Sequence, residues 1–442
     1  MTPYSLRRQK VLQQIGVDGI AVLFAATEHT RSGDTTFPFR QNSDFHYLSG
    51  FPEPEAVLVL DGATQTSTLY CRRKDPLYEI WEGFRYGAEA ACAAFGFDAA
   101  HDTDTWQSHL ETALQDKRRL YALWGQCPEH DTALLHCWHG VQQKAGQRLF
   151  GGNHCAPDML ADLAAILNPM RLLKDSHEQA LLKQAGQISA QAHIRAMQAA
   201  RPGMNELQIE AELTHEFMRH GARFPAYASI VAGGKNACCL HYTANRDMLQ
   251  NGELLLIDAG AEYQFYAGDI TRTFPVNGQF SPAQKDLYEV VLAANEAGIA
   301  AVKPGADWAD LHQITLRILV RGLIDFKLLQ GSVDGNIESL AYQRYYMHGL
   351  GHWIGLDVHD VGGRWHNGQA VLLQAGMCTT IEPGLYIPAD SDIPAAFRHT
   401  GIRIEDNILV TGDGHENYTA AAPKTVTDIE AIMREARCSS AF

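Results

Sequence analysis

The chain has 442 residues and a formal net charge of −15, from 36 Lys and Arg against 51 Asp and Glu. This length exceeds one typical hydrophobic core and predicts two domains. The acidic balance argues against nucleic-acid binding, and with no signal-like segment and no apolar run of transmembrane length we expect a soluble, cytoplasmic protein without a membrane partner.

The amino-terminal part, residues 1–170, has the pattern of an α/β domain. Short apolar runs at residues 21–24 and 56–60 are typical of strands, and helical patterns follow between residues 88 and 167. Asn168-Pro169-Met170 then interrupts the helical pattern. We therefore expect the first domain to cover residues 1–170 and the second to cover residues 171–442.

The second domain alternates helices with pairs of strands, which predicts an α+β architecture. A long helix is expected to open near Ser176 and Glu178 and to end at Arg201-Pro202-Gly203. Further helices are predicted at residues 206–220, 282–302 and 307–323. The strand pairs between these helices carry the acidic residues that attract attention.

The first acidic pair is Asp258 and Asp269. An apolar run over residues 253–257 ends in Asp258, which predicts a strand buried on both faces. Asp269 lies in the next extended stretch, residues 266–274, so the two carboxylates can face each other across a hairpin. Burial of two ionised carboxylates is strongly unfavourable, and the pair therefore implies a cation or a raised pKa.

The second acidic pair is Glu382 and Glu405. Pro383 biases Glu382 toward extended backbone, so this acid lies on a strand or at its end. Residues 401–410 alternate at period two, which places Arg403 and Glu405 on one face of a strand, where Arg403 can support the site. Taken singly, each acid is equally compatible with a capped or salt-bridged strand end.

Histidines cluster in residues 347–360, where His348, His352 and His359 are interleaved with glycines. Glycines at this density disfavour a helix and predict a loop whose backbone approaches a site closely. His241 stands alone and is equally compatible with a structural role. Four carboxylates with one imidazole suit a pair of divalent cations better than one tetrahedral zinc, so a two-metal hydrolase is the first hypothesis. The predicted ligands are Asp258, Asp269, His352, Glu382 and Glu405.

These motifs resemble the proline-specific metallopeptidases of the pita-bread fold and, among them, the Xaa-Pro aminopeptidase (aminopeptidase P) family. The resemblance rests on Leu256-Ile257-Asp258-Ala259-Gly260, Gly268-Asp269-Ile270-Thr271-Arg272-Thr273, His348-Gly349-Leu350-Gly351-His352, Asp357-Val358-His359-Asp360, Ile381-Glu382-Pro383-Gly384 and Arg403-Ile404-Glu405-Asp406. Residues 40–45 and 79–87 extend it over nearly the whole chain and resemble aminopeptidase P more than prolidase. It implies an α/β amino-terminal domain followed by an α+β pita-bread catalytic domain.

The resemblance also implies a role for each predicted ligand. Asp258 would chelate the first metal, and Asp269 and Glu405 would bridge the two metals. His352 and Glu382 would bind the second metal. Glu382 would also take the proton from the bridging water, so that the attacking hydroxide bridges both cations.

Further roles carried by the resemblance concern the substrate. The expected catalytic set beyond Glu382 is His241, His348, His359 and Arg403, in which the histidines orient the substrate, polarise the scissile carbonyl and shuttle protons. The expected substrate-contacting set is Asp34, Arg40, Trp81 and Tyr386. The amino-terminal domain would shape the cleft and build a homodimer or homotetramer. A core Trp with surface ion pairs is the alternative for the residues of that domain.

The implied activity is removal of the first residue from peptides with proline second, with two divalent ions. The carboxylate-rich set favours Mn²⁺ over zinc. The nearest alternative is prolidase, which shares the metal set but accepts only Xaa-Pro dipeptides. A methionine aminopeptidase would leave the amino-terminal domain unexplained, and an inactive pita-bread binding module or a creatinase-like enzyme would lack ligands that this chain retains.

Overall fold

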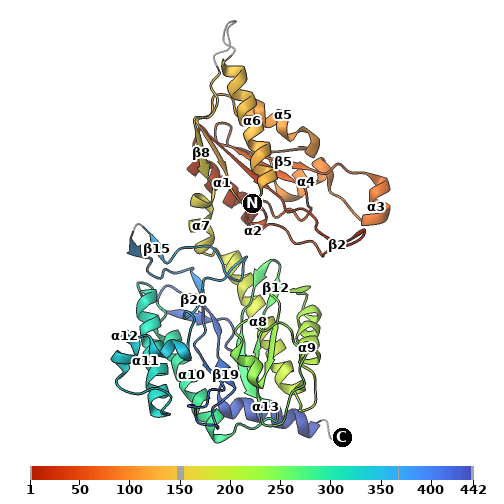
Figure 1. Ribbon diagram of the computed structural model, residues 1–442. Coiled ribbons are helices and arrows are strands. Elements are labelled where there is room, and N and C mark those ends of the chain that lie inside the picture. Colours follow the sequence, from red (N-terminus) through yellow and green to blue (C-terminus); the bar gives the residue numbers. More distant parts are fainter. Residues whose placement is uncertain (1, 147–153, 367, 440–442) are drawn as a thin grey trace. The chain divides into compact units, whose positions relative to one another are not determined.

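A computed structural model describes residues 2–146, 154–366 and 368–439 (Figure 1). The chain divides into two compact units, Met1–Met170 and Arg171–Phe442, named unit 1 and unit 2 below. Among the described residues, none of the helices combines the length and the apolar character that crossing a membrane requires.

Unit 1 is built on a six-stranded sheet with the order β6-β5-β4-β1-β7-β8. Its strands are β1 (Gly19–Phe24), β4 (Val57–Asp61), β5 (Thr66–Cys71), β6 (Ala99–Asp102), β7 (Arg119–Ala122) and β8 (Met159–Asp162), and a separate hairpin joins β2 (Thr30–Ser32) to β3 (Thr35–Thr36). β1 pairs antiparallel with β4 and parallel with β7. Both central strands are buried along nearly their whole length, as expected where helices cover a sheet.

The helices of unit 1 include several that pack on this sheet. They are α1 (Pro3–Ile15), α2 (Ser43–Ser49), α3 (Pro76–Glu82), α4 (Gly87–Phe95), α5 (Trp106–Ala113) and α6 (Pro128–Gly146), with a 3-10 turn, η1 (Thr103–Thr105). Leu110 of α5 and Leu134 of α6 join Ile20 and Val57 of the sheet in one apolar cluster. The α/β architecture predicted for this part of the chain is confirmed.

One expectation at the end of this part was wrong. α7 (Ala164–Leu172) continues through Asn168-Pro169-Met170, with Pro169 inside the helix. Proline removes one N–H donor but its fixed φ is compatible with helical backbone. A nine-residue helix therefore loses a single hydrogen bond and is not interrupted.

Unit 2 places its strands in several small antiparallel sheets. Three-stranded sheets have the orders β10-β11-β14, β13-β12-β9 and β17-β20-β21, and two-stranded sheets join β18 to β19 and β15 to β16. The strands are β9 (Phe224–Pro225), β10 (Ile230–Gly233), β11 (Leu254–Asp258), β12 (Ala261–Tyr263), β13 (Tyr266–Ala267), β14 (Thr271–Pro275), β15 (Trp365–His366), β16 (Gln369–Ala370), β17 (Cys378–Ile381), β18 (Gly384–Ile387), β19 (Thr400–Arg403), β20 (Asp406–Val410) and β21 (His415–Asn417).

Two helix pairs flank these sheets, α8 with α9 and α10 with α11 (Figure 1). The helices of unit 2 are α8 (Ser176–Ala199), α9 (Glu206–Arg219), α10 (Pro282–Ala301), α11 (Trp308–Asp325), α12 (Val333–Glu338) and α13 (Val426–Ser439), with 3-10 turns η3 (Gly234–Cys238) and η4 (Ala341–Arg344). The four long helices that the sequence predicted are confirmed to within two residues at each end. The cap of α8 is Asp175, whose side chain accepts from the backbone of Glu178 in a capping box.

Unit 2 has two halves: α8 and α9 with strands β9–β14 form the first half, and α10 and α11 with strands β17–β21 form the second. One apolar core joins them. It contains Leu213 of α9, Leu255 of β11, Leu319 of α11 and Ile402 of β19, all fully or nearly fully buried. The helix pair α8/α9 covers β9, β10, β12 and β13, whereas α10 covers β17, β18 and β19. The acidic residues lie at the strand ends that point into the space between the two halves.

The extended stretches predicted around the acids are interrupted. Residues 266–274 contain two strands, β13 and β14, and the connection before them holds β12, so Asp258 and Asp269 do not flank a simple hairpin. Residues 401–410 are divided between β19 and β20, and Glu405 lies in the break. Every residue of β19 and β20 is buried, so the alternation of residue types did not distinguish a buried face from an exposed one.

Candidate metal centre

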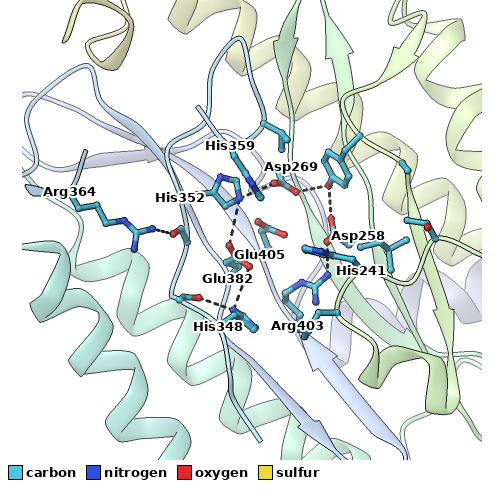
Figure 2. A pocket seen from close by; sticks show the side chains of 18 residues that line it. His241, Asp258, Asp269, His348, His352, His359, Arg364, Glu382, Arg403 and Glu405 are labelled. Atoms are coloured by element: carbon cyan, nitrogen blue, oxygen red, sulfur yellow. Dashed lines mark hydrogen bonds and ion pairs between the residues drawn. The ribbon is translucent and has the colours of Figure 1, made fainter. Parts of the chain in front are cut away.

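A cavity of about 560 Å³ opens in unit 2 between the strand ends (Figure 2). This size is within the range of small-molecule and peptide pockets. The cavity is lined by all the predicted ligands and all the predicted catalytic residues: His241, Asp258, Asp269, His348, His352, His359, Glu382, Arg403 and Glu405. Residues 347–360, which carry three of these histidines, form a loop, as predicted.

The strands of the first half hold Asp258 and Asp269 near each other. Asp258 ends β11 opposite Thr271, and Asp269 lies two residues before that partner. The hydroxyl oxygen of Tyr227 is 2.6 Å from Oδ1 of Asp258 and 2.5 Å from Oδ1 of Asp269. A phenol has one proton and can donate to one carboxylate at a time. Tyr227 therefore holds Oδ1 of each acid, and Oδ2 of each acid is left to other partners.

The second half brings Glu405 to the same place. Ile381 pairs with Asp406 in the β17–β20 ladder, so Glu382 and Glu405 lie just beyond the last pair. The Thr271 hydroxyl donates to Oε2 of Glu405 at 2.7 Å, which connects the two halves. The break between β17 and β18 at residues 382–383 and the break between β19 and β20 at residues 404–405 thus each contain an acid of the centre.

Asn407 fixes the backbone of Asp269 across 138 residues of sequence. Its side-chain amide accepts from the Asp269 N–H at 2.9 Å and donates to the Asp269 carbonyl at 2.5 Å. All of these groups are buried. Such a two-point contact leaves the carboxylate of Asp269 little freedom to move away from the cavity.

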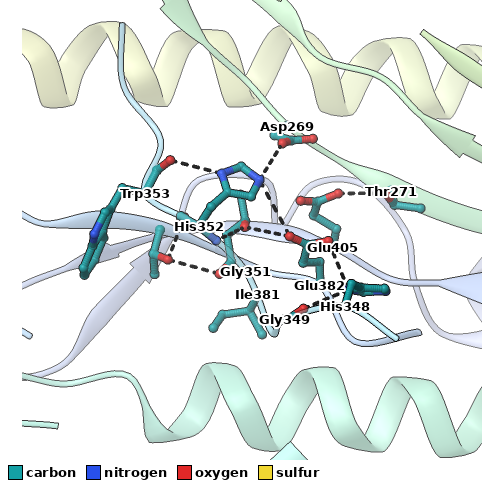
Figure 3. A network of polar contacts seen from close by, with 12 residues as sticks. Asp269, Thr271, His348, Gly349, Gly351, His352, Trp353, Ile381, Glu382 and Glu405 are labelled. Atoms are coloured by element: carbon teal, nitrogen blue, oxygen red, sulfur yellow. Dashed lines mark hydrogen bonds and ion pairs between the residues drawn. The ribbon is translucent and has the colours of Figure 1, made fainter. Parts of the chain in front are cut away.

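The tautomer of His352 suits a metal ligand. Nδ1 lies 3.0 Å from the Trp353 carbonyl, which can only accept, so Nδ1 carries the proton (Figure 3). Nε2 faces Oδ2 of Asp269 at 3.3 Å and Oε1 of Glu382 at 3.7 Å. Nε2 therefore points at the carboxylates and, once deprotonated, would offer its lone pair to a cation, as in metal-binding histidines whose other nitrogen donates to a backbone carbonyl.

A chain of hydrogen bonds joins Arg403, Tyr386 and His348. Arg403 donates to the Tyr386 hydroxyl at 2.9 Å, and that hydroxyl is 2.9 Å from Nε2 of His348. Nδ1 of His348 lies 2.8 Å from the Gly349 carbonyl and must donate to it. Burial lowers the pKa of His348 to about 4, so the ring is neutral and Nε2 accepts from Tyr386. Arg403 also pairs with Oδ2 of Asp258 at 2.5 Å.

The charges of the centre favour a bound cation. Burial raises the pKa of Glu382 to about 7 and also raises the pKa of Asp258 and Glu405 above its usual range. Burial alone would lower the pKa of His352, but Asp269 outweighs this effect and raises it to about 9. Carboxylates crowded in a dry site resist ionisation unless a positive charge is shared among them.

The donor atoms are close enough to hold such a cation. One atom each of Asp269, His352 and Glu405 lies within 4.8 Å of the others. Asp258 shares the Tyr227 hydroxyl with Asp269, and Oε1 of Glu382 lies 3.7 Å from Nε2 of His352. An oxygen-rich set with one imidazole nitrogen fits hard or borderline divalent cations.

Several residues of the centre gave no signal in the sequence. Tyr227, Thr271 and Asn407 each fix an acid, yet all three are ordinary polar residues within strands or short connections. Arg364, which also lines the cavity, donates to the Gly351 carbonyl. Only the spatial contact identifies these residues, because their partners are far away in the sequence.

The substrate residues predicted in unit 1 lie on its surface. Asp34 is exposed between β2 and β3, and Arg40 donates to the carbonyl of Gln41 and the hydroxyl of Ser43. Trp81 in α3 is 88% exposed, which excludes the alternative that it is a core residue. Contact of these three residues with substrate stays a prediction.

Replacing Gly260 with alanine is expected to disturb the first half of the centre. A Cβ at Gly260 would lie 1.7 Å from the Gly268 carbonyl oxygen, and both backbones are fixed by strand contacts. Because neither can retreat, we expect the free energy of unfolding to fall by about 3 kcal/mol. Urea denaturation with a spectroscopic readout measures the change.

The matched control is Gly414→Ala, since a Cβ there meets nothing within 4 Å. It is expected to change the free energy of unfolding by less than about 0.5 kcal/mol. Equal stability of the two variants would contradict the close approach between Gly260 and Gly268.

Comparisons with known proteins cover both units. Residues 180–412 match the model of metallopeptidase family M24, and residues 4–121 match the aminopeptidase P N-terminal domain. The chain is 43% identical to the Xaa-Pro aminopeptidase of Escherichia coli K12 over 437 residues, which cover 98% of each protein. Among solved structures, Pseudomonas aeruginosa aminopeptidase PepP has 42% identity and a TM-score of 0.95 with 98% of each chain covered. A Zn-substituted E. coli aminopeptidase P in complex with product has 43% identity, a TM-score of 0.94 and the same coverage.

Proposed function

The chain belongs to metallopeptidase family M24 and, within it, to the Xaa-Pro aminopeptidases, and we propose that its activity depends on two divalent cations held in the cavity of unit 2. The enzyme hydrolyses the bond between the first residue of a peptide and a following proline. The observation that carries the assignment of the site is the convergence of four carboxylates and the Nε2 lone pair of His352 on one cavity. The pita-bread and α/β architectures expected for the two parts are those of the family.

The cation ligands are proposed to be Asp258, Asp269, His352, Glu382 and Glu405. Divalent cations bound there lower the pKa of a water, polarise a carbonyl and stabilise negative charge in the transition state. Asp269 and Glu405 lie centrally, since both belong to the trio of atoms within 4.8 Å and each is fixed by a partner from the other half. These two carboxylates are therefore the best placed to be shared between two cations.

Glu382 is proposed to act as general base and then as general acid. It is not in an ion pair with an arginine or lysine in the part of the chain that the structure describes, and its oxygens lie 3.7 Å from Nε2 of His352 and 3.8 Å from Nδ1 of His348. A carboxylate held loosely at a cavity wall can accept a proton and return it to the leaving amine. The leaving group here is the proline nitrogen, which has no N–H of its own.

The histidines and Arg403 are proposed to handle the substrate. His348 receives a hydrogen bond from Tyr386, and His241 and His359 line the cavity wall. Arg403 balances the charge of Asp258, next to which the free amino terminus of the peptide would dock. In this arrangement Arg403 and Tyr386 orient groups that contact the peptide.

Manganese, cytoplasmic location and a homo-oligomeric state are further parts of the proposal. The proposed ligand set supports Mn²⁺, because it consists of four carboxylates and one imidazole and contains none of the thiolates that select zinc. Oligomerisation is supported by α3, which exposes Leu77, Ile80 and Trp81 and buries none of its residues. Exposed apolar surface of this kind is typical of association sites.

Arginine release from Arg-Pro-Pro is the experiment that tests the activity. We expect release of arginine by the purified enzyme with Mn²⁺ present, because the chain matches the Xaa-Pro aminopeptidases in both of its parts. Free arginine and the Pro-Pro product are measured by liquid chromatography with mass spectrometry. Arg-Ala-Ala is the matched control and is expected to be cleaved at least 10²-fold more slowly, an order-of-magnitude figure for a site built around one substrate shape.

Prolidase is the alternative that the same experiment excludes or supports. Hydrolysis of an Xaa-Pro dipeptide without arginine release from Arg-Pro-Pro would contradict the aminopeptidase assignment. The match of residues 4–121 to the aminopeptidase P N-terminal domain favours release from the longer peptide.

A further inference from the structure

His359 occupies the cavity wall at a position that its own side chain does little to secure. It lies at the exposed end of the loop formed by residues 347–360, and its ring meets His352 edge to face with 4.2 Å between centroids (Figure 2). Within the described residues, no hydrogen bond to the His359 ring is present. The ring is therefore placed by the backbone on either side of it and by its contact with His352.

Two carboxylates flank His359, and one guanidinium nitrogen contacts both. Nη2 of Arg171 donates to Oδ2 of Asp357 at 2.7 Å and to Oδ1 of Asp360 at 2.6 Å. Nζ of Lys174 donates to Oδ2 of Asp360 at 2.7 Å. The cluster has two positive and two negative charges, so it is neutral as a whole.

Three members of this cluster are buried, which makes it a fixed element. The side chains of Arg171, Lys174 and Asp360 are 1–2% exposed, whereas Asp357 is 40% exposed. Burial alone would raise the pKa of Asp360, but Lys174 and Arg171 outweigh this effect and hold it below its usual value. Asp360 is therefore ionised wherever the enzyme is folded at neutral pH.

The backbone around the cluster closes the loop. The Asp360 N–H donates to the Trp353 carbonyl at 2.9 Å, and the Gly355 N–H donates to the Asp357 carbonyl at 3.0 Å. A Cβ at Gly355 would lie 2.1 Å from Oδ2 of Asp360, so only glycine leaves room for that carboxylate. The loop is thus fixed just before and just after His359.

We propose that Arg171 is a positioning residue for His359, which it orients toward the substrate by clamping Asp357 and Asp360 on both sides of it. The proposal rests on the function proposed above, in which His359 contacts the peptide. Arg171 is neither a proposed metal ligand nor a residue of the cavity lining, so it acts on turnover through the loop that carries His359.

A double-mutant cycle of Arg171→Lys and His359→Ala tests this coupling. Lysine keeps the charge balance of the cluster, but its Nζ lies one bond nearer the backbone than Nη2, the nitrogen that contacts both carboxylates. We expect Arg171→Lys to lower kcat on Arg-Pro-Pro at least tenfold, with KM changed less than threefold. In the His359→Ala background the same substitution is expected to change kcat less than twofold, because there is no imidazole left to misplace.

Multiplicative losses in the double variant would overturn the proposal, as would unchanged kcat in the Arg171→Lys single variant. If Arg171→Lys fails to fold, the double-mutant cycle is repeated with Asp357→Asn in its place, because the side chain of Asp357 is half-exposed. Leu319→Ala, in the core of α11, is the control for lost stability without a clamp: it is expected to lower the melting temperature and leave kcat at 25 °C within twofold. Lys183→Gln removes an exposed pair with Glu416 and is expected to change neither quantity.

Hydrogen exchange tests the clamp without reference to activity. Amides of residues 355–361, followed by mass spectrometry, are expected to exchange at least tenfold faster in Arg171→Lys, and segments of α10 and α11 are expected to stay unchanged. Equal exchange in wild type and variant would overturn the proposal even if turnover falls. If the wild-type enzyme releases no arginine, the proposed function fails, and exchange still decides whether Arg171 holds the loop.

Discussion

Glu382→Gln is expected to lower kcat on an Xaa-Pro peptide by about 10²–10⁴-fold and to leave the protein folded. Glutamine keeps the shape and one acceptor oxygen of Glu382, but it cannot take a proton at neutral pH. Glu382 follows the last residue of β17, and its N–H donates to the Leu350 carbonyl at 2.8 Å. That backbone contact does not depend on the side chain, so the strand end persists in the variant.

Steady-state kinetics on Arg-Pro-Pro, together with metal content and circular dichroism, measure this effect. The matched control is Glu416→Gln, which alters an exposed carboxylate paired with Lys183 and is expected to be neutral. A Glu382→Gln enzyme that retains kcat within fivefold of wild type would refute the assignment of Glu382 as the base.

Removal of divalent metal by a chelator is expected to abolish arginine release, by about 10³-fold or more, because Lewis-acid and water activation are worth several kcal/mol. Adding Mn²⁺ back is expected to restore activity in proportion to bound metal until two equivalents per chain are reached. The physical reason is the number of carboxylates: four acids around one imidazole carry more negative charge than one cation balances.

Metal titration followed by elemental analysis measures the stoichiometry, and parallel titrations with Zn²⁺ and Co²⁺ identify the preferred cation. Asp269→Asn is expected to reduce the bound metal, since this acid is the best placed to be shared. Asp334→Asn, at an exposed carboxylate paired with Arg317, is the control. Full activity at one equivalent would contradict the pair of cations.

The convergence of the proposed ligands on one cavity could be predicted, because each of them stands out against its local pattern. Asp258 ends an otherwise apolar buried strand, and Glu382 is kept extended by Pro383. Such residues violate the pattern of their element and require a partner, which points to a site. The long helices were equally accessible, because α10 begins at Pro282 after a capping box of Ser281 and Gln284, and α11 is capped by Asp307.

The supporting residues could not be predicted, because their partners come from distant parts of the chain. Asn407 contacts Asp269 and Arg171 contacts Asp360, and neither pair is visible in a local window of sequence. The break at Glu405 was also missed, since residues 401–410 read as one alternating strand. Its N–H donates to the Thr271 carbonyl, and this tertiary contact overrides the local alternation.

Gly260 and Gly355 show that the geometry of the centre is specified partly by missing side chains. At each position a carbonyl or carboxylate occupies the volume where a Cβ would stand. A mutational scan would therefore find these backbone positions intolerant of every substitution, whereas Leu240 and Val358 of the cavity wall have room to vary. The preference for the first residue of the peptide can consequently diverge among descendants of this chain while the arrangement of the ligands stays unchanged.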